Sequence, residues 1–175
     1  MGVLNIEFKA RTADPAGLEK RLLELGPLFI GEDRQVDTYF NVSQGRLKLR
    51  EGNIENALIW YERPDSPGSK VSKVLLYQHQ PDPALKVILI RIHGIKVIVE
   101  KRRRIYFINN VKFHFDEVPG LGYFVEVEAI DRTGEIGIEK LQQDCDHYAE
   151  LFGIRTEDYI SCSYSDLIRM PCSWY

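Results

Sequence analysis

A strictly alternating stretch, VLNIEFKAR at residues 3–11, indicates the fold class of this chain. Every second residue in it is apolar, namely Leu4, Ile6, Phe8 and Ala10. The residues between them are polar or charged, namely Asn5, Glu7, Lys9 and Arg11. Because successive side chains of a β-strand point to opposite faces, the stretch predicts a strand with one apolar face and one charged face.

The segments that follow predict further strands joined by short turns. Runs of strand-forming residues occupy positions 29–40, 46–51, 57–63, 71–77, 95–103, 105–108, 111–117 and 123–130. Glycine, proline, serine and asparagine lie between most of these runs, and the pair Asn109 and Asn110 predicts a tight hairpin turn. Such spacing is typical of antiparallel hairpins.

Three helices are expected beside these strands. Asp14 followed by Pro15 predicts the start of a helix over residues 14–25, and Gly26 with Pro27 ends it. Further helices are expected at 82–93 and at 134–152, each ended by a glycine. The sequence therefore predicts one α+β domain over residues 1–168, with roughly eight strands in a closed or nearly closed sheet and helices outside it. Residues 169–175 are expected to form a disordered tail.

The composition excludes several classes of protein. The chain of 175 residues has 23 Lys and Arg against 26 Asp and Glu, so its net charge of -3 gives no overall attraction to nucleic acid or to an anionic membrane. Its apolar runs are too short for a membrane helix, and its beginning lacks the features of a secretory signal. Its three cysteines match no zinc motif. We therefore expect a cytoplasmic protein with reduced thiols.

Several predicted strands carry charged residues at successive positions of one face. The basic ones are Lys9, Arg11, Lys48, Arg50, Arg63, Lys101 and Arg103, and the acidic ones are Glu7, Asp116, Glu126 and Glu128. On a single strand, such residues ordinarily form the solvent-facing side of a sheet. Inside a barrel they would need a ligand, because unpaired buried charges are costly.

A triphosphate bound together with a divalent cation would match both signs of charge. Lysine and arginine bind phosphate oxygens, and the planar guanidinium can donate two hydrogen bonds at once. The carboxylates would repel the same anion unless a hard cation such as Mg²⁺ or Mn²⁺ lay between them. The charged faces therefore predict a cavity that holds a triphosphate and a metal ion.

Six stretches of the sequence together resemble the CYTH family, which includes class IV adenylate cyclases, thiamine triphosphatases and inorganic triphosphatases. They are NIEFKAR (5–11), DTYF (37–40), LKLRE (47–51), RPD (63–65) with Lys70, EKRRRIY (100–106) and FDEVPGLGYFVEVE (115–128). They occur in the family's order over most of the chain. The first and last stretches are most similar to the cyclase-like branch.

This resemblance implies an eight-stranded antiparallel β-barrel, the triphosphate tunnel, with flanking helices. It implies that the metal ligands are Glu7, Asp116, Glu126 and Glu128. It implies that the phosphate-binding residues are Lys9, Lys48, Arg50, Arg63, Lys70, Lys101 and Arg103, to which the charged strand faces add Arg11. Lys9 matches the lysine of the family's Glu-x-Glu-x-Lys signature and is the candidate catalytic residue, either as a phosphate ligand, which we favour, or as a base.

Asn5 departs from that signature, because it stands where the family has its first glutamate. An amide oxygen can still bind a hard cation, but it carries less charge than a carboxylate. The sequence therefore leaves open whether one metal ion or two would bind.

Two reactions and two other functions remain open at this point. Attack by water on the terminal phosphorus would make the protein a triphosphatase, whereas attack by the ribose 3′-hydroxyl of ATP on the α-phosphorus would make it a cyclase. The other functions are a noncatalytic module that binds nucleotide or polyphosphate and a scaffold domain with paired charges. Nucleic acid is not expected to bind the run 101–104, because alternation points Arg102 and Arg104 away from Lys101 and Arg103.

Some polar and aromatic residues are interpreted as structural. His114 shares a face with Asp116, but a lone histidine on a strand is more often hydrogen-bonded or solvent-facing than catalytic. The aromatic residues Tyr39, Trp60, Tyr61 and Phe124 are interpreted as packing residues and not as groups that stack on a base. The sequence therefore names no head group for the substrate.

Overall fold

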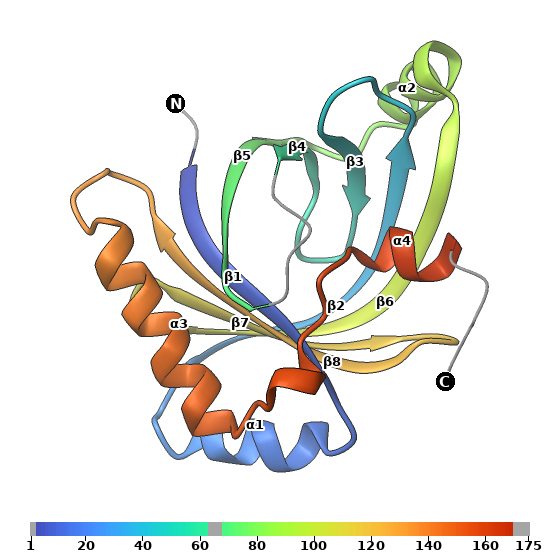
Figure 1. The fold of residues 1–175 in the computed structure, drawn as a ribbon. Coiled ribbons are helices and arrows are strands. Elements are labelled where there is room, and N and C mark those ends of the chain that lie inside the picture. The colour runs from blue at the N-terminus through green and yellow to red at the C-terminus, as the bar shows by residue number, and fades with distance from the viewer. Residues whose placement is uncertain (1–2, 63–67, 170–175) are drawn as a thin grey trace.

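The chain folds into a closed barrel of eight antiparallel strands, as the sequence predicts (Figure 1). The computed structural model describes residues 3–62 and 68–169. The order of neighbours around the barrel is β1-β5-β4-β3-β2-β6-β7-β8, and β8 pairs with β1 to close it. The strands are β1 (Val3–Thr12), β2 (Leu28–Phe40), β3 (Arg46–Glu51), β4 (Ala57–Glu62), β5 (Lys70–Gln78), β6 (Ile95–Ile108), β7 (Val111–Val118) and β8 (Gly122–Asp131).

The alternating residues of β1 lie on two opposite faces, as the sequence predicts. Its residues Ile6, Phe8 and Ala10 are buried in a hydrophobic cluster, whereas Glu7 and Lys9 line a cavity inside the barrel. In the pairing of β1 with β8, Glu7 lies opposite Glu128 and Lys9 lies opposite Glu126. The register therefore places charged residues from distant parts of the sequence side by side.

The helices are α1 (Pro15–Leu23), α2 (Pro83–His93), α3 (Ile138–Phe152) and α4 (Tyr164–Arg169), with a 3₁₀ turn, η1, at Thr156–Asp158. The first begins with the cap that the sequence predicts, Asp14, and the second is capped by Asp82. The carboxylate of Asp14 accepts the backbone N–H of Gly17 at 2.9 Å, and that of Asp82 accepts the N–H of Ala84 at 2.8 Å. Each of these hydrogen bonds pairs a backbone donor that a helix start would otherwise leave without a partner.

The apolar pattern predicted that the third helix begins at residue 134, but it begins at Ile138. The carboxylate of Asp131 holds the preceding loop by accepting four backbone N–H groups, from Thr133, Gly134, Ile136 and Gly137. Gly134 and Gly137 have φ values of 81° and 84°, which a helix does not allow. The hydrogen bonds of this loop therefore delay the helix.

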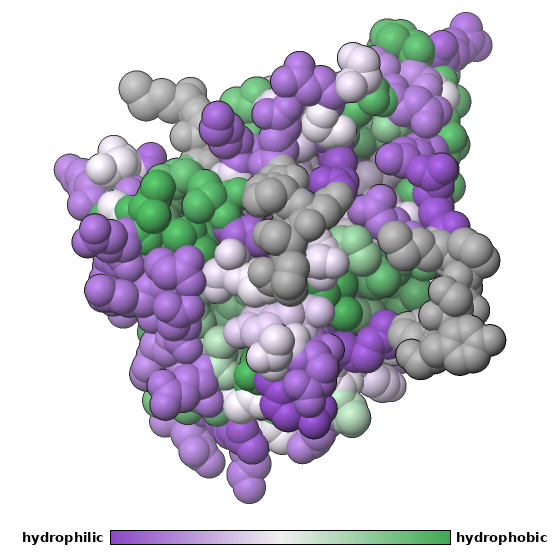
Figure 2. All heavy atoms as spheres, in the orientation of Figure 1, coloured by the Kyte–Doolittle hydropathy of each residue, from purple (hydrophilic) through white to green (hydrophobic). Residues whose placement is uncertain are grey.

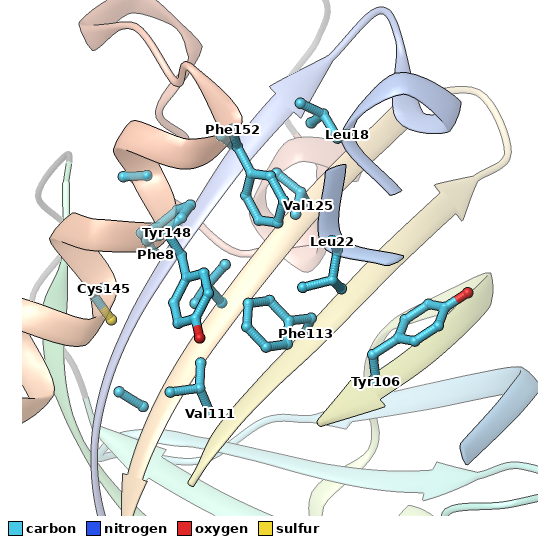
Figure 3. Close-up of a cluster of buried hydrophobic side chains, with 14 of the residues drawn as sticks. Phe8, Leu18, Leu22, Tyr106, Val111, Phe113, Val125, Cys145, Tyr148 and Phe152 are labelled. Carbon is cyan, nitrogen blue, oxygen red and sulfur yellow. The ribbon is translucent and has the colours of Figure 1, made fainter. Parts of the chain in front are cut away.

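Helices α1 and α3 cover the outer face of one side of the barrel (Figure 1). Figure 3 shows Tyr148 and Phe152 of α3 pointing at Phe113 of β7, with Leu22 of α1 beside them. The solvent side of α3 is mostly hydrophilic in Figure 2, as expected for an amphipathic helix. This cluster is outside the barrel, so the barrel interior is available for charged groups.

Two other features differ from the sequence prediction. The runs expected at 95–103 and 105–108 form one strand, because the ladders from β6 to β2 and to β7 continue through Arg104.

After α3, the chain crosses one end of the barrel, where the N–H of Ile160 donates to the carbonyl of Lys9 at 2.9 Å. The short helix α4 that follows was not predicted. The predicted tail (apart from Arg169, the last residue of α4) and the candidate Arg63 lie outside the described residues.

None of the helices in the described parts of the chain has both the length and the apolar character that crossing a membrane requires.

Candidate active site

A cavity of about 600 Å³ occupies the interior of the barrel. The structure brings together eight of the predicted site residues on its lining, namely Glu7, Lys9, Lys48, Arg50, Lys101, Arg103, Glu126 and Glu128. They come from β1, β3, β6 and β8, which the closed barrel arranges around one space. The charged strand faces therefore point inward, and the interpretation of them as ordinary solvent-facing surfaces is wrong.

The acidic cluster, defined as Glu7, Glu126 and Glu128, lies on the neighbouring strands β1 and β8. His114 of β7 adjoins it, with Nδ1 at 3.2 Å from Oε2 of Glu126 and 3.6 Å from Oε1 of Glu128. One ligand atom from each of His114, Glu126 and Glu128 lies within 4.8 Å of the others. Burial raises the pKa of Glu128 to about 7, and the charges of Glu7 and Glu126 add to this effect. A cation placed here would relieve that repulsion.

His114 is a neutral imidazole at physiological pH. Burial lowers its pKa to about 3, and the positive charges of Arg103 and Lys112 act in the same direction. It is fully buried beside the acidic cluster and not exposed to solvent. Of the two alternatives in the sequence interpretation, His114 is hydrogen-bonded, to Glu126 at 3.2 Å, and not solvent-facing. A neutral imidazole can also be a metal ligand, a role that the sequence interpretation left out.

The basic cluster, defined as Lys48, Arg50, Lys101 and Arg103, lines the cavity from strands β3 and β6. Three of its members share one buried carboxylate, that of Asp37 on β2. Asp37 accepts two hydrogen bonds from Arg50 at 2.9 Å each, one from Lys101 at 2.7 Å and one from Lys48 at 3.2 Å. Although burial opposes it, these three cations hold the pKa of Asp37 well below its usual value. Asp37 therefore keeps the cluster assembled and partly neutralised without a ligand.

The crowding of cations changes the acidity of Lys101. Burial lowers the pKa of its ammonium group to about 7, and the neighbouring charges of Arg50, Arg103 and Lys48 contribute, whereas Asp37 opposes the change. An added anion such as phosphate would favour the charged form of this lysine. The cluster is therefore suited to bind a polyanion.

Arg103 connects the basic side to the acidic side. Its guanidinium donates to both oxygens of Asp116, at 2.7 and 2.6 Å, and to Glu126 at 3.0 Å. The hydroxyl of Tyr164 in α4 donates to the same Asp116 at 2.7 Å. The carboxylate of Asp116 is thus fully engaged beneath the cavity surface, and Asp116 is not among the residues that line the cavity.

Lys9 lies between the acidic cluster and the C-terminal segment. Its ammonium group is 2.7 Å from Oε1 of Glu126, and it stands 3.7 Å from the centre of the Tyr164 ring. An ammonium over a tyrosine ring is stabilised by the ring's negative face. Both contacts hold the ammonium group of Lys9 at the cavity surface, where it is placed to bind a phosphate oxygen.

A loop between β3 and β4 adds an acid that the sequence did not suggest. Asp33 accepts the backbone N–H groups of Asn53, Ile54 and Glu55, and this fixes the loop. Glu55 then reaches into the cavity, where its carboxylate pairs with Arg50 at 3.1 Å and also with Lys112. Glu55 therefore occupies, in this structure, a place between two cations that a phosphate group would also favour.

Three predicted residues take other positions. Arg11 donates to the backbone carbonyl of Leu121 at 2.6 Å, and Lys70 donates to the carbonyl of Ser161. Neither of them lines the cavity, and nor does Asp116. Arg63 cannot be placed, because it lies outside the described residues.

The basic run 101–104 divides between the two faces of β6, as alternation predicts. Lys101 and Arg103 are buried inside the barrel. Arg102 faces outward and pairs with Glu32 and Glu117, and Arg104 pairs with Glu19. The four residues therefore form no continuous basic surface for nucleic acid.

Among the aromatic residues interpreted as packing, Tyr39 and Tyr61 are buried and also line the cavity. Phe124 is buried in the barrel interior against Tyr164, with ring centroids 5.0 Å apart. Trp60 donates from its indole N–H to the carbonyl of Gln44 at 3.2 Å. The packing interpretation is thus incomplete for the two tyrosines.

Comparison with known proteins agrees with this fold. The sequence model of the CYTH domain matches residues 4–161 of the chain. Among solved structures, the PH1012 protein from Pyrococcus horikoshii OT3 is similar with a TM-score of 0.80 and 26% identity, over 93% of this chain and 98% of that one. A comparison with curated proteins finds no match.

Two further structures share the fold at lower identity. One is a candidate adenylate cyclase from Vibrio parahaemolyticus, with a TM-score of 0.79 and 17% identity over 97% of this chain and 100% of that one. The other is HpAC1 from Hippeastrum, named as a candidate adenylyl cyclase and described as having a dominant triphosphatase activity. It has a TM-score of 0.61 and 16% identity, over 97% of this chain and 95% of that one.

Proposed function

Because the chain belongs to the CYTH family, we propose that it is a divalent-metal-dependent enzyme that transfers a phosphoryl or nucleotidyl group from a triphosphate. One observation carries this proposal. The basic cluster and the acidic cluster line one cavity and meet at Arg103 and Glu126, and each is suited to a different part of a metal–triphosphate complex. Several neighbours in the fold are named for reactions of triphosphates, which supports the same conclusion.

The basic cluster would hold the phosphate oxygens. Arg50 and Arg103 are already oriented by the carboxylates of Asp37 and Asp116, so little side-chain ordering is left for substrate binding to supply. Lys48 and Lys101 add two ammonium donors on the same side. Lys9 would bind a phosphate near the acidic cluster, and we assign it as a ligand of the substrate and not as the base.

The acidic cluster fits a divalent cation. Ligand atoms of Glu126, Glu128 and His114 lie close together, and Glu7 is directly opposite Glu128 in the pairing of β1 with β8. Burial, together with the charges of Glu7 and Glu126, raises the pKa of Glu128. We propose that Glu7, Glu126 and Glu128 bind Mg²⁺ or Mn²⁺, with His114 adjacent. Asp116 was expected to join them, but we assign it to positioning Arg103, because both its oxygens are engaged there. A bound cation of this kind neutralises phosphate charge and polarises the reacting phosphorus.

The reaction that these groups support is an in-line displacement at phosphorus. In hydrolysis, a water oxygen forms a bond to the terminal phosphorus while the bond to the bridging oxygen breaks, and the remaining diphosphate leaves. In cyclisation, the ribose 3′-oxygen bonds to the α-phosphorus and pyrophosphate leaves. In both cases Arg50, Arg103 and Lys101 stabilise the charge that grows on the leaving oxygens.

The test is to incubate the full chain with ATP, thiamine triphosphate or inorganic tripolyphosphate in Mg²⁺ or Mn²⁺. Products are identified as phosphate, pyrophosphate or cyclic AMP by chromatography. We expect turnover of at least one substrate, and we expect a chelator to abolish it. Tight binding without any product would contradict an enzyme and would favour a noncatalytic module that binds triphosphates.

A further inference from the structure

One side of the cavity wall carries no charge. It consists of Ile59 and Tyr61 on β4 and Val74 and Leu76 on β5, which we call the apolar patch. Ile59 lies directly opposite Leu76, and Tyr61 lies directly opposite Val74, in the pairing of the two strands. The patch is therefore a continuous surface made of two adjacent cross-strand pairs.

The apolar patch is open at one end. Ile59 and Tyr61 are buried, whereas Leu76 has 52% of its surface exposed although it lines the cavity. A leucine left in contact with water beside a charged site contributes little to folding. Covering it with an apolar group would be favourable, because apolar surface would leave water.

Two polar side chains border the patch and have buried atoms without a partner. Ser72 lies two residues before Val74 on the same inward face of β5, and Asn5 of β1 lies directly opposite Ser72. Among the described residues, neither Oγ of Ser72 nor Oδ1 of Asn5 has a hydrogen-bond partner. A buried polar atom without a partner is costly, so both atoms are placed to bond a ligand.

The order of these groups along the strands gives the ligand an orientation. Along the inward face of β1, the sequence runs from Asn5 through Glu7 to Lys9, and Lys9 contacts Tyr164 at the end that the C-terminal segment crosses. Along β5, the inward face runs the other way, from Ser72 beside Asn5 to Leu76. The patch therefore adjoins the acidic cluster on the side away from Tyr164.

We infer that the apolar patch, together with Ser72 and Asn5, is a subsite for the head group of an organic triphosphate. The inference rests on the proposed function of the cavity. The phosphates extend toward Lys9 and Arg103, and a flat or apolar ring lies against Val74 and Leu76. Ser72 and Asn5 accept or donate hydrogen bonds to polar atoms at the edge of that ring. The site consequently prefers an organic triphosphate to inorganic tripolyphosphate, which has nothing to cover the patch.

The test compares the binding of ATP, thiamine triphosphate and inorganic tripolyphosphate to the full chain in Mg²⁺. Dissociation constants are taken from titrations completed before product forms. At least one organic triphosphate is expected to bind about tenfold more tightly than tripolyphosphate, the size of effect that one good apolar contact gives. Leu76→Asn and Val74→Thr should remove most of this preference by weakening only the organic ligand.

The chain offers a matched control in the next residue. Leu75 has 54% of its surface exposed, close to the value for Leu76, but it does not line the cavity. Leu75→Asn should change no dissociation constant. Equal binding of all three ligands to the wild-type chain, or an equal loss for all three in Leu76→Asn, would overturn the inference. These binding data are independent of turnover, so an absence of products would count against the proposed function alone.

Discussion

Replacing Glu126 with glutamine is expected to lower kcat by roughly 100-fold to 1000-fold, the usual cost of removing one group that stabilises charge in a transition state. Glu126 lies 2.7 Å from Lys9, 3.0 Å from Arg103 and 3.2 Å from His114, so it links the acidic cluster to the phosphate-binding residues. An amide of the same shape cannot supply the negative charge that a cation requires. Initial rates at saturating Mn²⁺, with the preferred triphosphate, measure the effect.

Glu117→Gln is the matched control for this variant. Glu117 lies on the adjacent strand β7, but it is on the outer surface, where it pairs with Arg102 at 3.3 Å. Its replacement should leave the rate within about a factor of two, because exposed ion pairs contribute little. Thermal unfolding of both variants shows whether each is folded. A folded Glu126→Gln protein with nearly normal kcat would contradict the assignment of the acidic cluster.

Replacing Asp37 with asparagine is expected to lower the free energy of unfolding by about 3–5 kcal/mol, the usual cost of removing one partner of a buried ion pair. The carboxylate of Asp37 is the shared partner of Lys48, Arg50 and Lys101. Without it, three cations would repel one another at the side of the cavity. Denaturant unfolding in the absence of ligand measures the loss.

The same variant should respond more strongly to ligand. Removing Asp37 leaves excess positive charge, so tripolyphosphate with Mg²⁺ should stabilise Asp37→Asn by more than it stabilises the wild-type chain. Glu51→Gln on β3 is the control, because Glu51 pairs with Lys86 at the surface at 2.6 Å and its loss should cost below about 1 kcal/mol. A loss below about 1 kcal/mol in Asp37→Asn, with no added response to ligand, would show that Asp37 does not hold the basic cluster.

The charged faces of the strands could be predicted because alternation alone determines them. In β1, β3, β6 and β8, the period of two places Glu7, Lys48, Arg103 and Glu128 on the face opposite the apolar residues. Closure of the sheet then decides that this face is the inside. The strand pattern predicted a closed or nearly closed sheet and the family resemblance implied a barrel, and the pairing of β1 with β8 confirms the closure.

Other parts of the site depend on contacts that no local pattern encodes. Glu55 comes from a loop whose shape is set by Asp33, twenty-two residues earlier in the chain. Tyr164 belongs to a six-residue helix, which is too short to show a helical period. The sequence of β7 alone does not show that His114 has an acidic neighbour, because Glu126 lies opposite it on β8. Asp37 is an exception, because Asp33, Gln35 and Asp37 alternate along β2 as the other charged faces do, and this signal was present in the sequence.

The positions of Arg11 and Asp116 show the limit of alternation as a guide to a site. Both lie on the expected faces of their strands, but other parts of the chain provide partners for them. Arg11 donates to the carbonyl of Leu121 in the β7–β8 turn, and Asp116 accepts from Tyr164 in the C-terminal segment. A strand face is long, and only some of its residues line the cavity. Which residues these are depends on what covers the end of the barrel.

The most direct test of the central claim is a crystal structure of the chain with Mn²⁺ and tripolyphosphate, in which anomalous scattering locates the metal ion. The account predicts a manganese peak bound by oxygens of Glu7, Glu126 and Glu128, with phosphate groups against Arg50, Lys101 and Arg103. A manganese ion bound elsewhere, or phosphates that leave the basic cluster paired only with Asp37, would contradict it.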